Sequence, residues 1–250
     1  MTGRVAIVTD AGPGIGAATV RELTSRGAQV VAAGRGADEL PAQARSNAGG
    51  EAEILTMPAD ICDAGQAERL VARVRHVFGR VDVLVNNSAG AWYKMLAHSS
   101  PDEISGIVGT NLTGTILMTR AVLPGMLEQS QGAIINVSSL GGRVAVEPLY
   151  SATMYGIRGF SLAVRRQLAN SRISVSLVSL GDVRLHMSTH VHARMPGPDE
   201  VARMIASLIK RPRRELIVTA RFHAALLLEE GLRDLARAAY GWRDRGNGAA

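Results

Sequence analysis

The sequence predicts an α/β fold, in which a central parallel sheet of about seven strands carries helices on both faces. Short apolar runs rich in Val and Ile alternate along the chain with longer stretches of helical period. The runs are almost continuously apolar, as strands buried on both faces require. Regular alternation of strands and helices then predicts right-handed crossovers between parallel strands.

The expected strands are short and lie at residues 4–9, 28–34, 52–58, 81–87, 132–139, 172–179 and 214–220. Helical period is clear at 16–27 and 64–79, and a long helix is expected around Tyr150. Residues 222–245 are typical of an amphipathic helix that packs or makes a subunit contact, with attachment to a membrane surface as the alternative. Because no repeat or linker interrupts the pattern, we expect a single domain over residues 1–245 and a disordered tail at 246–250.

The composition argues against several classes of protein. Of 250 residues, 46% are hydrophobic and 20% charged, which is typical of one globular domain. The net charge of +6 is spread along helices and aromatic residues are only 4%, so we expect no nucleic-acid partner. Cys62 is the single cysteine, which excludes an internal disulfide and a multi-cysteine metal site. The first apolar run is too short to span a bilayer, so we expect a soluble cytoplasmic protein.

A glycine-rich turn follows the first expected strand. Gly12, Gly14 and Gly16 lie in "TDAGPGIGAATVREL", at the junction between the strand and a helix. Glycines there let the backbone approach a pyrophosphate, and the helix N-terminus supplies N–H groups and the positive end of its dipole. The position favours a dinucleotide site over a tight turn without a ligand.

Further motifs follow in one order: "PADICD" after the third strand, "DVLVNNSAG" at the fourth, "TNLTG" in a helix, "INVSS" at the fifth, then "YSATM" and "SLGDV". Together they resemble the short-chain dehydrogenase/reductase family, from about Val5 to about Met187. The resemblance implies a single doubly wound Rossmann-fold domain that binds NAD(H) or NADP(H) and acts on a small carbonyl or alcohol substrate. It also implies a homodimer or homotetramer.

The same resemblance implies the site residues. In the catalytic set, Asn111 orders a proton-relay water, Ser139 hydrogen-bonds the substrate carbonyl and Tyr150 is the acid/base. The positions implied for the cofactor are Thr9, Gly14, Ile15, Gly16, Asp60, Ile61, Asn86, Gly181 and Val183.

Four positions depart from the family pattern where it touches the cofactor. Asp10 replaces the first glycine of the phosphate turn, while Leu180 and Leu185 replace a proline and a threonine after the sixth strand. Met154 replaces the lysine that binds the nicotinamide ribose and lowers the pKa of the tyrosine. All four remove flexibility, a charge or a hydrogen bond, so the departures put cofactor affinity and turnover in question.

Met154 bears most directly on catalysis. It lies one helical turn after Tyr150, whose phenol has an ordinary pKa of about 10 and is a weak acid or base at neutral pH without a nearby cation. Arg158 and His186 are candidates for a substitute cation. The alternatives are a solvated or salt-bridged helix residue for Arg158 and a loop residue for His186.

The end of the second strand bears on cofactor choice. An acid there would bind the ribose 2′-OH of NAD, whereas an arginine suits the 2′-phosphate of NADP. Arg35 occupies the basic position and no acid precedes it, so the sequence favours NADP(H), with NAD(H) as the alternative. A solvated strand-end arginine is the other reading of Arg35.

Two functions of different classes follow. The first is an NADP(H)-dependent oxidoreductase acting on a carbonyl or secondary alcohol, slowed by Met154. The second is a catalytically inactive Rossmann-fold binding or assembly protein with a degraded cofactor site. The presence of Asn111, Ser139 and Tyr150 favours the first.

Overall fold

The computed structural model describes residues 1–35, 54–87, 90, 94–181 and 196–218. Residues Met1–Val218 form one compact unit. Residues 219–250, and with them the expected amphipathic helix and tail, lie outside the described residues. The single domain over 1–245 therefore stays a prediction.

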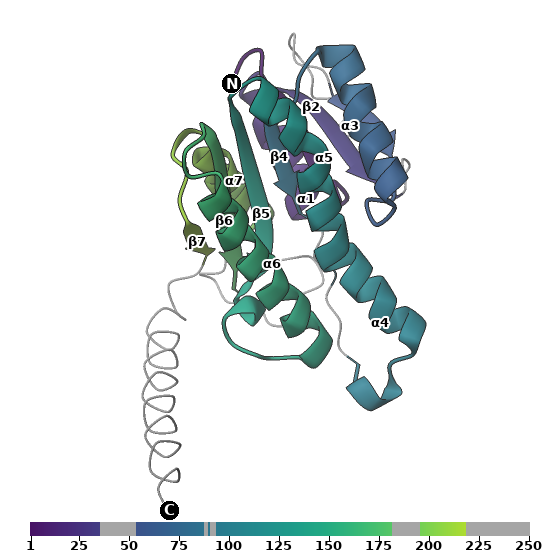
Figure 1. The fold of residues 1–250 in the computed structure, drawn as a ribbon. Coiled ribbons are helices and arrows are strands. Elements are labelled where there is room, and N and C mark those ends of the chain that lie inside the picture. Colours follow the sequence, from purple (N-terminus) through teal and green to yellow (C-terminus); the bar gives the residue numbers. More distant parts are fainter. Residues whose placement is uncertain (36–53, 88–89, 91–93, 182–195, 219–250) are drawn as a thin grey trace, which may run out of the picture. The chain divides into compact units, whose positions relative to one another are not determined.

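Seven parallel strands form one sheet in the order β3-β2-β1-β4-β5-β6-β7 (Figure 1). Their bounds are β1 (Val5–Thr9), β2 (Gln29–Gly34), β3 (Ile54–Pro58), β4 (Val83–Asn86), β5 (Gly132–Ser139), β6 (Ile173–Leu180) and β7 (Glu215–Val218). The chain moves outward from β1 in one direction and, from β4 on, in the other. This reversal places a topological switch point between β1 and β4, where α/β sheets bind ligands at the carboxyl ends of their strands.

The helices lie on both faces, which confirms the predicted fold class. Their bounds are α1 (Ile15–Ser25), α3 (Ala64–Phe78), α4 (Pro101–Val108), α5 (Gly114–Glu128), α6 (Pro148–Gln167) and α7 (Pro198–Lys210). Short 3₁₀ turns η2 (Leu96–His98) and η4 (Leu140–Gly142) and a π turn η3 (Gly109–Thr113) complete the described elements.

Alternation along the strands divides the core between the two faces. In β1, Ala6 and Val8 pack in the core beneath α1 and α7, whereas Val5 and Ile7 pack in the core beneath α3, α5 and α6. All four residues are buried, as the continuous apolar runs predict.

Local signals in the sequence fix several helix ends. The Asp63 side chain accepts a hydrogen bond from the Gln66 N–H and caps α3, which ends at Gly79 in the left-handed conformation, with φ of 75°. Ser100 and Glu103 form a reciprocal capping box at the start of α4. Glu147 caps α6, and so holds the first turn of the helix that carries Tyr150.

Candidate active site

The turn after β1 keeps the backbone of a phosphate-binding loop although its first glycine is replaced. Asp10 has φ of 47°, in the left-handed region that glycine adopts freely and that Asp and Asn tolerate better than other residues. Its carbonyl oxygen accepts a hydrogen bond from Asn87 Nδ2 at 3.0 Å. Asp10 therefore preserves the shape of the turn and adds a carboxylate to it.

Two glycines of this turn are sterically required. Gly14, the residue before α1, has φ of 110° and ψ of −135°, a conformation essentially confined to glycine. A Cβ on Gly16 would lie 2.2 Å from the Asp10 carbonyl oxygen. Ile15 begins α1 and packs partly against the core. Among the described residues no side chain caps this helix N-terminus, so the turn has the backbone and the helix end that a pyrophosphate needs.

Thr9 joins the turn to the neighbouring strand. Its side chain is buried; the hydroxyl donates to the Val85 carbonyl at 3.4 Å and accepts from the Asn87 N–H at 3.1 Å. These bonds hold together the carboxyl ends of β1 and β4, on the two sides of the switch point. The role of Thr9 in the described structure is to fix this junction.

Asp60, Cys62 and Arg35 lie together beyond β2 and β3. Asp60 Oδ1 accepts from the Cys62 N–H at 3.0 Å. Burial, a hydrogen bond with Asp60 and the Asp60 charge raise the pKa of the Cys62 thiol, while Thr110 and the charge of Arg35 act in the opposite direction. Arg35 is therefore within electrostatic reach of Cys62, at the place where the sequence predicts the ribose end of the cofactor. Ile61 is 7% exposed and packs against Gly114.

Asn86 belongs to a buried ladder of polar side chains. Its Nδ2 donates to Thr119 Oγ1 at 3.2 Å and to Asn136 Oδ1 at 2.8 Å, and Asn136 Nδ2 donates to Ser161 Oγ at 2.8 Å. The ladder links β4 and β5 to α5 and α6. Asn86 is 1% exposed and its amide nitrogen is engaged in the interior, and its contact with a cofactor stays a prediction.

Asn111 lies in the π turn η3 between α4 and α5, within the stretch "TNLTG" that the sequence places in a helix. π turns inside helices are frequent at functional sites. Asn111 Nδ2 donates to the Gly90 carbonyl at 3.0 Å and to Thr153 Oγ1 at 3.1 Å, and its Oδ1 accepts from the Gly90 N–H at 2.8 Å. Both amide hydrogens are thus engaged, and Asn111 ties the chain after β4 to α6.

Ser139 and Tyr150 lie on two sides of Gly141. Ser139 ends β5, and its Oγ accepts from the Gly141 N–H at 3.1 Å. A Cβ on Gly141 would lie 3.1 Å from Cε1 of the Tyr150 ring. Both side chains are half-buried at the carboxyl edge of the sheet. The structure therefore brings together the two residues that the sequence predicts as the carbonyl partner and the acid/base.

Met154 is fully buried beside this pair. It packs with Ile157 and Leu177 in a small apolar cluster, against which Tyr150 also packs. A Cβ on Gly142 would lie 2.6 Å from the Met154 carbonyl oxygen, so η4 rests directly on this part of α6. The described structure uses Met154 as a packing residue.

Arg158 is engaged elsewhere. Its Nε lies 3.5 Å from Glu215 Oε2 and makes no hydrogen bond within the part of the chain that the structure describes. Of the two interpretations of Arg158, the structure supports the salt-bridged helix residue. The other candidate cation, His186, lies outside the described residues.

Glu215 is the centre of an ionic cluster that sequence reasoning missed. Its side chain is 7% exposed, and Arg143 donates to both carboxylate oxygens, at 2.9 and 2.7 Å. Ser179 Oγ donates to Oε1 at 2.6 Å. Burial raises the pKa of Glu215, but the Arg143 and Ser179 hydrogen bonds and the charges of Arg143 and Arg158 outweigh it and hold this pKa below its ordinary value.

This cluster anchors the segment that follows Ser139. Arg143 comes directly after η4, and its carbonyl accepts a hydrogen bond from the Tyr155 hydroxyl of α6. The η4 turn is therefore held from both sides, by β7 through Glu215 and by α6 through Tyr155. A charged residue beginning the short apolar run "ELIV" was the signal that the sequence offered.

The segment after β6 is only partly described. The Gly181 N–H donates to the Val218 carbonyl at 3.0 Å, continuing the β6–β7 ladder. Val183 and Leu185 lie outside the described residues. Among those described, no group of acidic, His and Cys side chains has the geometry to hold a metal ion, and no helix is long and apolar enough to cross a bilayer.

Comparison with known proteins identifies the family. Residues 4–196 match the model of the short chain dehydrogenases. The 3-oxoacyl-[acyl-carrier-protein] reductase of Synechocystis is 32% identical over 228 residues, covering 85% of this chain and 91% of that protein. Ketoacyl reductase HetN of Nostoc is 32% identical over 229 residues, covering 87% of this chain and 79% of that protein.

Solved structures agree. A metagenomic short-chain oxidoreductase in complex with NADP is 31% identical with a TM-score of 0.77, over 87% of this chain and 97% of that one. A short-chain dehydrogenase from Streptomyces avermitilis, 22% identical, matches the fold with a TM-score of 0.87 over 100% of both chains. The chain therefore belongs to the short-chain dehydrogenase family of NAD(P)-dependent oxidoreductases.

Proposed function

We propose that the protein is an NADP(H)-dependent reductase of carbonyl substrates, working slowly in the absence of the usual lysine. The observation that carries the proposal is the placement of Ser139 and Tyr150 around Gly141, at the carboxyl edge of the sheet. In this arrangement a carbonyl oxygen can meet a hydroxyl partner and a proton donor together. The reverse reaction, oxidation of a secondary alcohol, uses the same groups.

The residues after β1 fit a dinucleotide. Gly16 has no room for a Cβ and Gly14 adopts a conformation that side chains avoid, so the backbone is open to a pyrophosphate at the start of α1. Asp60 would hold the adenine end, and Arg35 would meet a 2′-phosphate, which favours NADP(H). The nicotinamide, when bound, supplies or accepts the hydride.

The chain's own residues handle the proton. Ser139 Oγ hydrogen-bonds the substrate oxygen and fixes its position, and Tyr150 gives its phenolic proton to that oxygen. The Asn111 side chain holds Gly90 and Thr153, so any relay water would be ordered by its backbone carbonyl, which accepts from Thr115 Oγ1 at 2.9 Å. A positioned acid contributes roughly 10²- to 10⁴-fold. With Met154 in place of a cation, only part of this factor is available.

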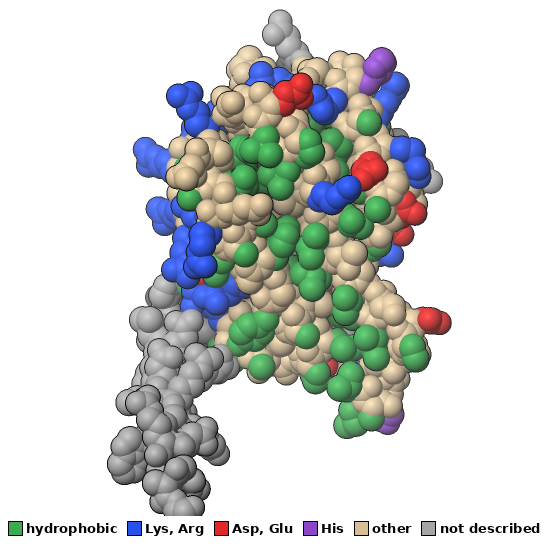
Figure 2. Space-filling model, viewed as in Figure 1, with side chains coloured by type: hydrophobic (Ala, Val, Ile, Leu, Met, Phe, Trp, Pro, Cys, Tyr) green, Lys and Arg blue, Asp and Glu red, His purple; other side chains and the backbone are tan. Residues whose placement is uncertain are grey.

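The substrate class rests on the relatives. Two of them are named as 3-oxoacyl and ketoacyl reductases, so we propose a ketone on an acyl chain as the substrate. Self-association into a homodimer or homotetramer, in the cytoplasm, is also proposed. Figure 2 shows hydrophobic side chains spread over the face that α5 and α6 cover, and Leu127 of α5 is 52% exposed, which supports a subunit contact there.

Titration of nicotinamide fluorescence tests the cofactor, and NADPH oxidation with a panel of 3-oxoacyl esters tests the reaction. We expect saturable binding that is tighter for NADPH than for NADH, and slow oxidation that Tyr150→Phe abolishes while NADPH binding is retained. Absence of a saturable signal with either cofactor would refute the reductase.

A non-catalytic binding or assembly protein is the second candidate. The observation that favours it is the complete burial of Met154 among apolar side chains, since a residue kept for packing suggests selection for something other than hydride transfer. Binding of NADPH without turnover of any ketone, in parent and Met154→Lys alike, would establish this alternative.

A further inference from the structure

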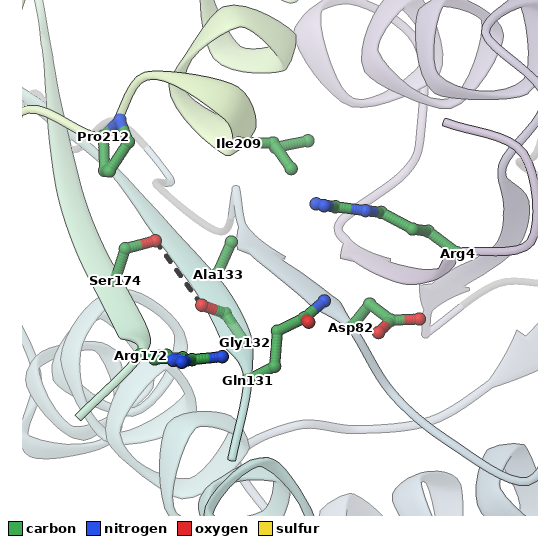
Figure 3. Close-up of a pocket in the computed structure, with 9 residues that line it drawn as sticks. All are labelled: Arg4, Asp82, Gln131, Gly132, Ala133, Arg172, Ser174, Ile209 and Pro212. Atoms are coloured by element: carbon green, nitrogen blue, oxygen red, sulfur yellow. Dashed lines mark hydrogen bonds between the residues drawn. The ribbon is translucent and has the colours of Figure 1, made fainter. Parts of the chain in front are cut away.

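A hollow of about 190 Å³ opens at the amino edge of the sheet, opposite the edge that carries Ser139 and Tyr150 (Figure 3). It is lined by residues that precede β1, β4, β5 and β6 and by the end of α7. Gly132, at the start of β5, lines the hollow, and Ser139 ends the same strand. Seven residue steps of about 3.3 Å separate the two by about 23 Å, so the hollow is distinct from the candidate active site.

Two arginines point into this hollow. Figure 3 shows the Arg4 and Arg172 side chains reaching toward its centre from opposite sides, one from the residue before β1 and the other from the residue before β6. Among the residues that the structure describes, neither guanidinium has a hydrogen-bond or ion-pair partner. Two cations that face one hollow without an ion pair to a described residue form a site where an anion gains from both.

The carboxylate that lines the hollow does not neutralise them. Asp82 is 2% exposed, and its Oδ2 accepts from the Val5 N–H at 2.9 Å. Arg80 donates to both of its oxygens, at 2.6 to 3.0 Å. The charge of Asp82 is thus offset by Arg80, and the charges of Arg4 and Arg172 remain.

Neutral polar groups complete the lining. The Gln131 side chain stands between the two arginines, and the Ser174 hydroxyl makes a 3.5 Å hydrogen bond to the Gly132 carbonyl (Figure 3). The basic segment 210–214 lies at the same edge of the sheet, between α7 and β7, and adds positive potential. The volume lies below the ~300 Å³ of sites for drug-sized ligands, so it suits a compact anion.

We propose that this hollow binds a small phosphate-type anion, with Arg4 and Arg172 as its two charged donors and Gln131 and Ser174 as neutral ones. The planar guanidinium fork matches phosphate oxygens and is the usual group for phosphate recognition. Free inorganic anions and the terminal phosphate group of a larger metabolite share this chemistry. Binding here is independent of the glycine turn after β1, because the two sites lie at opposite edges of the sheet.

Isothermal titration of the full chain with pyrophosphate and, separately, with inorganic phosphate and a simple phosphate monoester tests the proposal. We expect saturable binding in the parent and a loss of at least about tenfold in affinity in Arg4→Gln/Arg172→Gln, since hydrogen bonds to charged groups are the strong ones. The matched control is Arg73→Gln/Arg203→Gln, which removes the same charge from exposed positions on α3 and α7. This control should bind as the parent does.

Gln131→Glu is a second variant that leaves both arginines in place. Gln131 is exposed, so the variant should fold, and a carboxylate in the hollow should weaken binding by a similar factor. Equal weakening in the control pair would show a general charge effect and overturn the proposal. The proposal would also be overturned if the double variant and Gln131→Glu both bound the anion as tightly as the parent, because the anion would then lie at the glycine turn. Tighter binding of duplex DNA through the same arginines at physiological salt would also overturn it, in favour of a nucleic-acid surface.

Discussion

Ser138, and not Ser139, is the serine that contacts Met154: its Oγ lies 3.6 Å from the Met154 Sδ and 3.4 Å from the Met154 carbonyl oxygen. Strand alternation at the end of β5 separates the two serines, so Ser138 is buried against α6 while Ser139 is half-buried beside Tyr150. The residue that replaces the family's lysine is therefore held by packing and by one weak contact to sulfur.

We expect Met154→Lys to raise turnover and to lower stability. An ammonium one helical turn from Tyr150 favours the phenolate, and recovery of the full acid/base contribution would be roughly 10²-fold or more. The cost arises because Met154 is completely buried with Ile157 and Leu177, where a charge loses hydration. Steady-state rates with saturating NADPH and thermal unfolding measure the two effects.

Two further variants serve as controls for this experiment. Met154→Leu keeps an apolar side chain of similar volume and should change neither rate nor cofactor affinity appreciably. Adding Tyr150→Phe to Met154→Lys should abolish the gain. If Met154→Lys binds NADPH and still shows the parental rate, the lysine position does not limit this protein.

Asp10→Gly should tighten cofactor binding. Asp10 holds a φ of 47°, which glycine adopts freely, and the substitution removes a negative charge from the phosphate turn. NADPH titration measures the gain. Asp10→Asn also removes the charge but keeps a side chain, so the affinity for NADPH should rise in this variant as well. Weaker NADPH binding in both variants would mean that the carboxylate itself serves the site.

Glu215→Gln should destabilise the protein by about 3 kcal/mol at neutral pH, since it removes the buried carboxylate charge that Arg143 and Arg158 share. The pKa of Glu215 lies below its unfolded value, so its contribution is complete above the unfolded pKa of about 4.3 and is lost as pH falls through the folded pKa. Urea unfolding at pH 7 and at pH 3 should therefore show a large difference in stability between variant and parent that shrinks in acid.

Glu103→Gln, at an exposed pair with Lys94, is the control variant and should change the stability far less. A Glu215→Gln penalty that is the same at both pH values would show that packing, and not charge, is what Glu215 supplies.

The sequence predicts the sheet well because its strands are buried on both faces, and continuous Val and Ile runs leave little ambiguity. Its errors are at places where tertiary contacts decide. The expected strand 81–87 is shorter in the structure, Val83–Asn86, and just before it the Asp82 carboxylate accepts from the Val5 N–H and pairs with Arg80. The sequence places "TNLTG" in a helix but does not reveal that this is a π turn, whose hydrogen bonds join residues five apart, as from the Gly114 N–H to the Gly109 carbonyl.

The sequence predicted which residues belong to the candidate site, but not how their side chains contact one another. Ser139 and Tyr150 were placed by motif order, but the packing of Gly141 between them required the structure. Asn86 illustrates the limit, because a polar residue at a strand end looks the same in sequence whether it faces a ligand or, as here, a buried ladder. Glu215 could not be paired with Arg143 in advance, since 72 residues separate them.

Cys62 should react slowly with iodoacetamide at neutral pH, and its rate should rise through a midpoint above the ordinary thiol pKa of about 8.5. Burial and the neighbouring Asp60 disfavour the thiolate, which is the reactive form, while the charge of Arg35 opposes them. Asp60→Asn should therefore lower the midpoint and Arg35→Gln should raise it. Labelling followed by intact mass spectrometry across pH 6 to about 10 measures all three proteins, and the single cysteine makes the readout unambiguous.

Opposite shifts in the two variants would establish that Arg35 and Asp60 both lie near Cys62 beyond β2 and β3, where the ribose end of NADP is proposed to lie. A midpoint at or below the ordinary value, or identical midpoints in all three proteins, would contradict this arrangement and remove the main electrostatic support for Arg35 as the residue that selects NADP.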